Sequence, residues 1–302
     1  MTENNGRQDD FVSRMQLIDT LDATGRKHAA ARETTAAAQA WTQCAETLRD
    51  VVLALTLRQT EVLERAAAAT AQSGHPDRAL ALAHQAAALL RDARAADRLS
   101  EPEFAVRLGN VGMLLCAMQR WDDAARVLTE TDAAFAASTE VTAELRRRRV
   151  ATSAALATAH RFSGQQSDAL LVLERAVADA EAIVAATGAP SDRFELSDLH
   201  NMQGQILLET GQPDLAMPKL RRCVASIREL AGATRDPQPR NLLAAALNRL
   251  GHVHAKLGNR GEACECLTES VALMRKLVQQ DGLTGLADDL RTAQRDLATF
   301  GG

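Results

Sequence analysis

A short motif recurs along the chain, and it constrains the fold more than any other feature of the sequence. A glycine or polar turn residue is followed five positions later by alanine, as in SGQQSDAL, where Gly164 precedes Ala169. Six turn positions follow this pattern at intervals of 45 to 49 residues. They are Gly25, Gly74, Gln119, Gly164, Gly211 and Gly258. Such a period predicts an array of helix–turn–helix units.

Each recurring position has a steric reason. Glycine at a turn adopts the positive φ of a helix C-cap at low cost, and alanine at the start of the second helix allows two helices to approach closely. A further small residue recurs seven positions before four of the turns, at Gly112, Ala157, Gly204 and Gly251. Glycine inside a helix costs about 1 kcal/mol relative to alanine. Its recurrence in register therefore indicates a close contact between helices.

Composition supports helices and excludes several other classes. Hydrophobic residues make up 46% of the 302 residues, but aromatic residues only 3%, with no Tyr, which argues against a β-sandwich or barrel. No run of 18 apolar residues exists, and the polar start MTENNGRQDDF lacks the features of a signal peptide, so we expect a cytoplasmic protein with no membrane partner. The net charge of −4 gives no general attraction for nucleic acid. The five scattered cysteines are expected to be small core residues.

These units resemble the tetratricopeptide repeat (TPR), which has a small residue in helix A, glycine at the turn and alanine early in helix B. The best matches are LNRLGHVHAKLGNRGEACECLTESVAL (247–273) and LHNMQGQILLETGQPDLAMPKLRRCVASI (199–227). The usual period is about 34 residues, so the longer units here resemble the long-helix variant found in kinesin light chain and in many bacterial multi-repeat proteins. The resemblance implies an all-α, right-handed α-solenoid of about six hairpins, with helices of roughly 18–20 residues.

The domain organisation follows from the same pattern. We expect a disordered tail over residues 1–11 and one superhelical domain over 12–302. Proline-containing joints at 99–103, 187–193 and 234–240 each precede a new helix A. The segment 282–300 has apolar residues at helical spacing, and it is expected to cap the last open face of the array. Those residues are Leu286, Leu290, Leu297 and Phe300.

No motif for metal binding or catalysis stands out. In His252-Val253-His254 and Cys264-Glu265-Cys266, residues two apart point to different sides of a helix, so neither pair chelates from one face. His254 is expected on the packed face and His252 on the opposite one. Nucleophile-elbow, zinc-protease and phosphate-loop motifs are missing from the sequence. We therefore expect no enzyme, metal or cofactor.

The basic run 146–149 splays around one helical turn. Glu140 and Glu144 precede it at ion-pair spacing, which favours a solvated face. Contact with a phosphate or an anionic partner is the alternative.

The resemblance also implies where a partner would bind. In TPR proteins the A helices line a concave groove, and their register puts a set of polar residues and one methionine there. The set is Asn110, Met113, Arg161, Asn201, Gln205, Asn248, Arg249, His252 and Lys256. An asparagine amide both donates and accepts hydrogen bonds, so Asn201 and Asn248, one repeat apart, would bind a peptide main chain. The cations favour an acidic ligand or a C-terminal carboxylate. The alternative is that these are ordinary solvated residues.

The expected function is a protein–protein interaction scaffold or adaptor that binds a peptide or partner segment in this groove. A regulatory sensor that binds a small peptide or metabolite is the alternative. The residues before the first repeat are too few for a DNA-binding head. The formation of a homodimer is a further possibility that the sequence does not decide.

Overall fold

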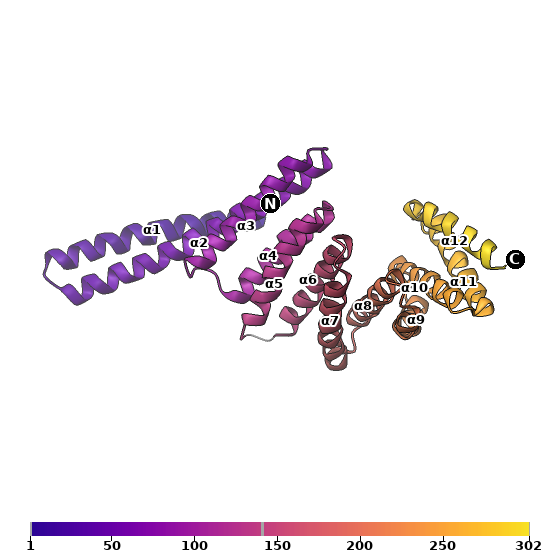
Figure 1. Cartoon of the computed structure of the whole chain (residues 1–302). Helices are drawn as coiled ribbons and strands as arrows, with labels where there is room; N and C mark the ends of the chain where they lie inside the picture. The colour runs from indigo at the N-terminus through magenta and orange to yellow at the C-terminus, as the bar shows by residue number, and fades with distance from the viewer. Residues whose placement is uncertain (1, 140–141, 302) are drawn as a thin grey trace. The chain divides into compact units, whose positions relative to one another are not determined.

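In a computed structural model of the chain, the described residues 2–139 and 142–301 form twelve α-helices and a short 3₁₀ turn, without a strand among them. Side chains are described for residues 11–139 and 142–300. The helices are labelled in Figure 1. They are α1 (Thr2–Ala30), α2 (Thr34–Gln72), α3 (Pro76–Ala95), α4 (Glu101–Ala117), α5 (Trp121–Ala137), α6 (Ala143–Phe162), α7 (Gln166–Thr187), α8 (Pro190–Glu209), α9 (Pro213–Ala233), α10 (Pro237–Lys256), α11 (Arg260–Gln279) and α12 (Ala287–Gly301).

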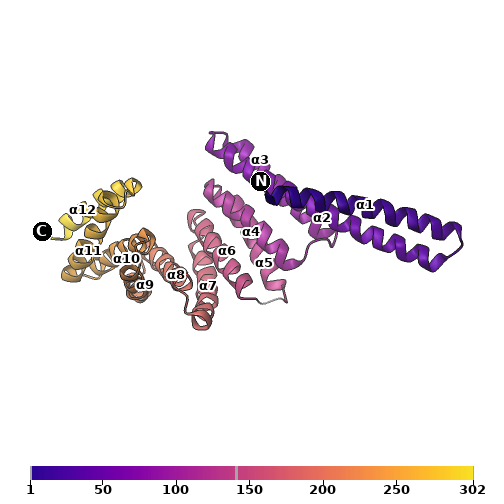
Figure 2. The same ribbon diagram turned by 180° about the vertical axis from the view of Figure 1, so that it is seen from behind.

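The chain forms two compact units. The first comprises Met1–Gln119 with Ala133–Ser138, and the second comprises Arg120–Asp132 with Thr139–Gly302. In the first unit α2 packs against α1 and α3, and α3 packs against α4. In the second unit each helix from α6 to α12 packs against the next, and both views show the neighbours as hairpins (Figures 1 and 2). The predicted all-α fold of sequential hairpins is confirmed.

Five of the six predicted turns are confirmed by backbone geometry. Gly74, Gly164, Gly211 and Gly258 have φ angles of +75° to +80°, and Gln119 has φ +57° at the equivalent position. In the left-handed region a residue without a Cβ atom avoids strain. The helices α3 to α11 that these turns and the joints separate are 17 to 22 residues long, which is close to the expected length.

The small residues after and before the turns also have the predicted role. The five alanines that follow the confirmed turns have no exposed surface. They are Ala79, Ala124, Ala169, Ala216 and Ala263. A Cβ atom at Gly251 would stand 2.8 Å from Leu267 Cγ on the next helix. The small residues therefore set the distance between paired helices.

The predicted turn at Gly25 is wrong. This glycine lies inside α1, and the chain turns instead around Arg32, whose φ is +62°. A Cβ atom at Gly25 would stand 2.5 Å from Trp41 Nε1. Gly25 therefore leaves room for the Trp41 ring and does not form a turn. The partner helix α2 is 39 residues long, about twice the expected length.

The predicted joints and the C-terminal helix are confirmed. α8 begins at Pro190 and α10 at Pro237, each with proline in the first turn. Helix α12 packs against α11. Its side of the contact includes Leu290 and Leu297, which lie against a core cluster containing Val271 and Leu277.

Three further expectations concern the chain as a whole. α1 already begins at Thr2; the division into a tail 1–11 and one domain 12–302 stays a prediction. Over the described residues, no helix combines the length and apolar character that a membrane crossing requires. None of the five cysteines, which all lie in the described part of the chain, forms a disulfide. Cys44 and Cys223 are buried as expected, whereas Cys116, Cys264 and Cys266 are only half-buried. Burial raises the pKa of the Cys223 thiol to about 12, so this cysteine behaves as a core residue.

Candidate functional site

A chain of polar contacts links the A helices α6, α8 and α10 within the second unit. At its centre, Arg249 of α10 donates one hydrogen bond to Asn201 Oδ1 and one to Gln205 Oε1, both at 2.9 Å. Asn201 and Gln205 lie four residues apart on α8, so they share one face of that helix. The structure therefore brings together three residues that the sequence predicted for one surface.

The same chain continues to α6 through a carboxylate. Gln205 Nε2 donates to Glu209 Oε1 at 3.0 Å. Arg161 of α6 binds both oxygens of Glu209, with Nε 2.8 Å from Oε2 and Nη2 2.6 Å from Oε1. The Arg161 guanidinium also lies 4.7 Å above the ring of Phe162. Glu209 thus neutralises the charge of Arg161, and the guanidinium is held between Glu209 and the Phe162 ring.

Arg249 has a different electrostatic environment. Burial is the main cause that lowers the pKa of the Arg249 guanidinium, followed by repulsion from Arg161. Its two hydrogen-bond acceptors are neutral amides, and it makes no ion pair with another described residue. The nearby Asp198 carboxyl is buried as well, which raises its pKa. The positive charge of Arg249 is therefore less well balanced than that of Arg161.

The two repeat-equivalent asparagines differ in their contacts. Asn201 is buried, and its amide group also donates to Asp198 Oδ1 at 3.4 Å. Asn248 of α10 is half-buried, and among the residues described its side chain has no hydrogen-bond partner. Lys256, further along α10, is exposed. Asn201 thus supports the chain of contacts, whereas Asn248 keeps its amide available.

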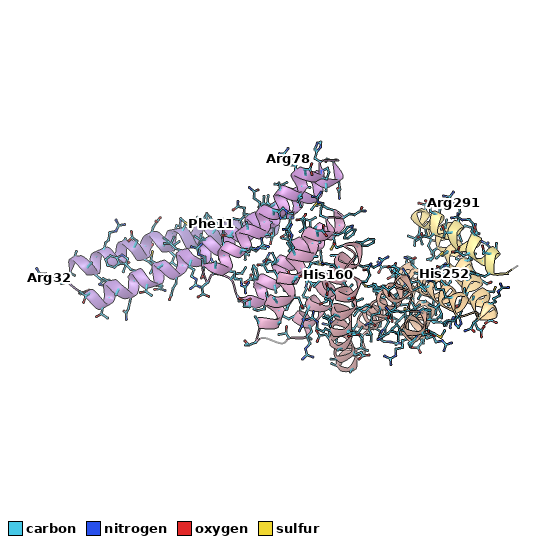
Figure 3. All side chains as sticks on the ribbon, viewed as in Figure 1. Phe11, Arg32, Arg78, His160, His252 and Arg291 are labelled. Carbon is cyan, nitrogen blue, oxygen red and sulfur yellow. The ribbon has the colours of Figure 1, made fainter. Side chains whose placement is uncertain are left out.

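His252 contacts the C-terminal helix. Its Nε2 lies 3.2 Å from Asp296 Oδ2, and its ring meets Phe300 edge-on at 6.1 Å between centroids. Figure 3 labels His252 on α10. His254, two residues later, is buried, so the two histidines occupy the opposite faces that the sequence predicted. Asn110 and Met113 lie half-buried on α4, in the first unit.

Three of the four arginines in the basic run at the start of α6 form ion pairs. Arg147 binds both carboxylate oxygens of Asp192 on α8, at 2.9 and 3.0 Å. Arg148 contacts Glu144 at 3.1 Å, as the spacing predicts. Glu140 lies outside the described residues. The run thus joins helices as well as facing solvent.

The comparisons with known proteins agree with this architecture. The model of the tetratricopeptide repeat family matches residues 243–282. The hairpin of α10 and α11 is therefore a tetratricopeptide repeat. None of the curated proteins matches the sequence.

Solved structures extend the likeness to most of the chain. A Podosopora anserina protein of kinesin-light-chain type, with nearly identical TPR-like repeats, has 23% identity and a TM-score of 0.55, over 75% of this chain and 98% of that one. The apo form of RapI has 9% identity and a TM-score of 0.58, over 95% of this chain and 70% of that one. At such identities the likeness concerns the fold alone.

Two features of the second unit were not predicted from the sequence. Asp198 lies one helical turn before Asn201, and its position in the repeat register could have identified it. A cavity of about 330 Å³ also opens between α6, α7 and α8, beside Arg147 and Glu195. Burial raises the pKa of the Glu195 carboxyl. No motif marks this cavity, because its walls come from three separate helices. Within the described residues, no group of three or more potential metal ligands lies together.

Proposed function

We propose that this protein is an interaction scaffold or adaptor, and that the A-helix surface of α6, α8 and α10 binds an extended peptide segment of a partner. The observation that carries the proposal is the contact of Arg249 with Asn201 and Gln205. Two amide oxygens hold the guanidinium in place without cancelling its charge. Such a group is positioned in advance to bind a carboxylate.

The energetics favour an anionic ligand at this point. Removing a guanidinium from water is unfavourable unless a counter-charge compensates it, and burial already lowers the pKa of Arg249. A ligand carboxylate would supply that counter-charge through charge-assisted hydrogen bonds. Lys256 lies seven residues further on α10 and shares this helix face. The proposed ligand is therefore an acidic segment or a C-terminal carboxylate.

Asn248 supplies the second element of the proposed site. Its amide can donate to and accept from a peptide main chain, and it adjoins Arg249 on α10. Together the two residues would bind one main-chain segment and one carboxylate. In this proposal Asn201 supports Arg249 instead of touching the ligand.

A peptide library tests the proposal directly. The purified chain is used to select from random decapeptides displayed with free C-termini, and the selected peptides are measured by calorimetry. We expect acidic sequences or free C-termini to be enriched, and Arg249→Gln to weaken binding roughly ten- to hundredfold, as expected for loss of a charged hydrogen bond of about 1.5–3 kcal/mol.

The control is Arg228→Gln. Arg228 pairs with Glu269 at 2.7 Å on the B helices α9 and α11, so its loss should leave binding unchanged. Selection of basic or purely apolar peptides, or equal binding by Arg249→Gln, would contradict the proposal. Recovery of a bound metabolite by native mass spectrometry, with no peptide selected, would favour the sensor alternative instead.

A further inference from the structure

The cavity of about 330 Å³ between α6, α7 and α8 shares no residue with the proposed peptide site. Helices α6 and α8 both pack against α7, as both views show (Figures 1 and 2). The ion pair of Arg147 with Asp192 joins α6 to α8 beside the cavity. Its volume is at the lower end of the range of about 300–1,000 Å³ that is typical of small-molecule sites. The cavity is therefore large enough for a small ligand or for one side chain of a partner.

One wall of the cavity is apolar, and the cavity is open to solvent. The wall consists of Val150 and Ala151 of α6 with Ala180 and Ile183 of α7. All but Ala151, which is half-buried, are buried. Ser191 of α8 also lines the cavity and is exposed, so the space is accessible from outside. A ligand with a short hydrocarbon portion would bury that portion against this wall.

Glu195 of α8 lines the cavity without a partner. It is half-buried, and it forms no hydrogen bond or ion pair with a described residue. Burial is the main cause that raises the pKa of its carboxyl, and repulsion from Asp198 and Asp192 acts in the same direction. No cation of the described chain lowers that pKa. A carboxylate that is removed from water beside other carboxylates is stabilised by a cation.

The two arginines that line the cavity already have carboxylate partners. Arg147 binds both oxygens of Asp192, at 2.9 and 3.0 Å, and Arg148 contacts Glu144 at 3.1 Å. All four of these residues line the cavity. Because their charges cancel in pairs, Glu195 leaves the lining with an excess of negative charge.

The helix N-termini beside the cavity do not reverse this balance. Both α6 and α8 begin near it, and a helix N-terminus favours an anion within its first turn. Those first turns already contain Glu144 on α6 and Asp192 on α8. Glu195 lies beyond the first turn of α8. The cavity therefore favours a cation over a phosphate or a carboxylate.

We propose that this cavity binds an alkylammonium group, which belongs either to a free amine or to a lysine side chain of a partner. The ammonium pairs with the Glu195 carboxylate, and its hydrocarbon stem lies against the apolar wall. Ser191 lies four residues before Glu195 and so shares its face of α8. The Ser191 hydroxyl can accept a second hydrogen bond from the ammonium.

Calorimetry on the full chain at neutral pH tests the charge of the ligand. The probes are n-butylammonium, the neutral butan-1-ol and the anion butyrate, which have similar stems. We expect saturable binding of n-butylammonium in the millimolar range, and binding at least about tenfold weaker for the other two probes. Absence of saturable n-butylammonium binding would overturn the proposal, as would equal binding of butan-1-ol. Tighter binding of butyrate would overturn it too, because it would assign the cavity to Arg147 and Arg148.

Three variants test the position of the ligand. Glu195→Gln keeps the size of the side chain and removes its charge, so it should weaken n-butylammonium binding at least about tenfold. Ala151→Leu fills the apolar part of the cavity without changing a charge, and it should weaken binding with unchanged helical circular dichroism. The control Glu174→Gln removes an exposed carboxylate of α7 that does not line the cavity, and it should bind as the wild type does. Wild-type affinity in Glu195→Gln or in Ala151→Leu would contradict the proposal.

A lysine derivative distinguishes the two sources of the ammonium. Nα-acetyl-lysine methylamide has an ammonium on a four-carbon stem, as n-butylammonium has, and adds a peptide main chain. Binding as tight as that of n-butylammonium would assign the cavity to a lysine side chain of a partner. Binding at least about tenfold weaker would assign it to a free amine, because the added main chain would not fit. Either result supports an alkylammonium site, provided that Glu195→Gln weakens binding of the probe.

Discussion

Gly204 of α8 lies so close to Leu220 of α9 that a Cβ atom added to the glycine would stand 2.4 Å from Leu220 Cγ. Leu220 is fully buried in the core between α8, α9 and α10. In this close-packed interior neither Leu220 nor an added Cβ atom has room to move aside. Glycine is a poor helix former, but at position 204 it allows α8 and α9 to approach closely.

Gly204→Ala is therefore expected to destabilise the protein, although alanine is the better helix former. Overpacking of a tight core costs about 1–3 kcal/mol, against a propensity gain of about 1 kcal/mol. We expect the free energy of unfolding in urea to fall. In the control Gly232→Ala, on α9, the added Cβ has no atom within 4 Å, so stability should rise. A stabilised Gly204→Ala variant would show that the helices separate without cost.

Gln119 is the one confirmed turn position of the repeat that lacks glycine. Its φ of +57° is unfavourable for a residue with a Cβ atom by about 1–2 kcal/mol, partly offset because glycine loses more entropy on folding. We expect Gln119→Gly to raise the thermal midpoint of unfolding, whereas Gly164→Gln, at the same position of the next hairpin, should lower it. Equal midpoints for both variants and the wild type would refute the strain argument.

The repeated turns were predictable because the same steric requirement occurs in each unit. The exception shows the limit of the pattern. Glycine serves both a positive φ and a close approach of side chains, and the sequence around Gly25 does not distinguish the two uses. The contact with Trp41, sixteen residues later, decides it. The real turn at Arg32 has no glycine to mark it.

The residues of the polar surface were predictable, but their contacts were not. The register placed Asn201, Gln205 and Arg249 on one face of the array, and the structure brings them together. The hydrogen bond from Arg249 to Asn201 was not predictable, since the two residues are 48 positions apart in the sequence. Such contacts depend on the distance between packed helices, which a repeat period does not specify.

This difference between the asparagines gives a matched test. Asn201→Ala removes an acceptor of the half-buried Arg249, and an unsatisfied buried group costs about 1–3 kcal/mol. Asn248→Ala, one repeat later, removes a side chain without a described hydrogen bond, so its effect should stay within about 0.5 kcal/mol. Urea unfolding of the two single variants measures both. Equal losses of stability would mean that the contacts of Asn201 do not support the fold.

The ion pair between Arg147 and Asp192 predicts a pH dependence of stability. Hydrogen bonds from Arg147 first, and then from the Thr187 hydroxyl at 2.6 Å, lower the pKa of the buried Asp192 carboxyl. A carboxyl whose pKa is lower in the folded state stabilises the fold above its unfolded pKa of about 3.9. That contribution is lost as the pH falls through the lowered folded value. The stability difference between wild type and Asp192→Asn should therefore be constant near neutral pH and should shrink below about pH 4. Arg147→Gln removes the main donor, so its difference from the wild type should shrink over the same range. A difference that stays constant down to pH 2 would show that the Asp192 carboxylate does not contribute through its charge.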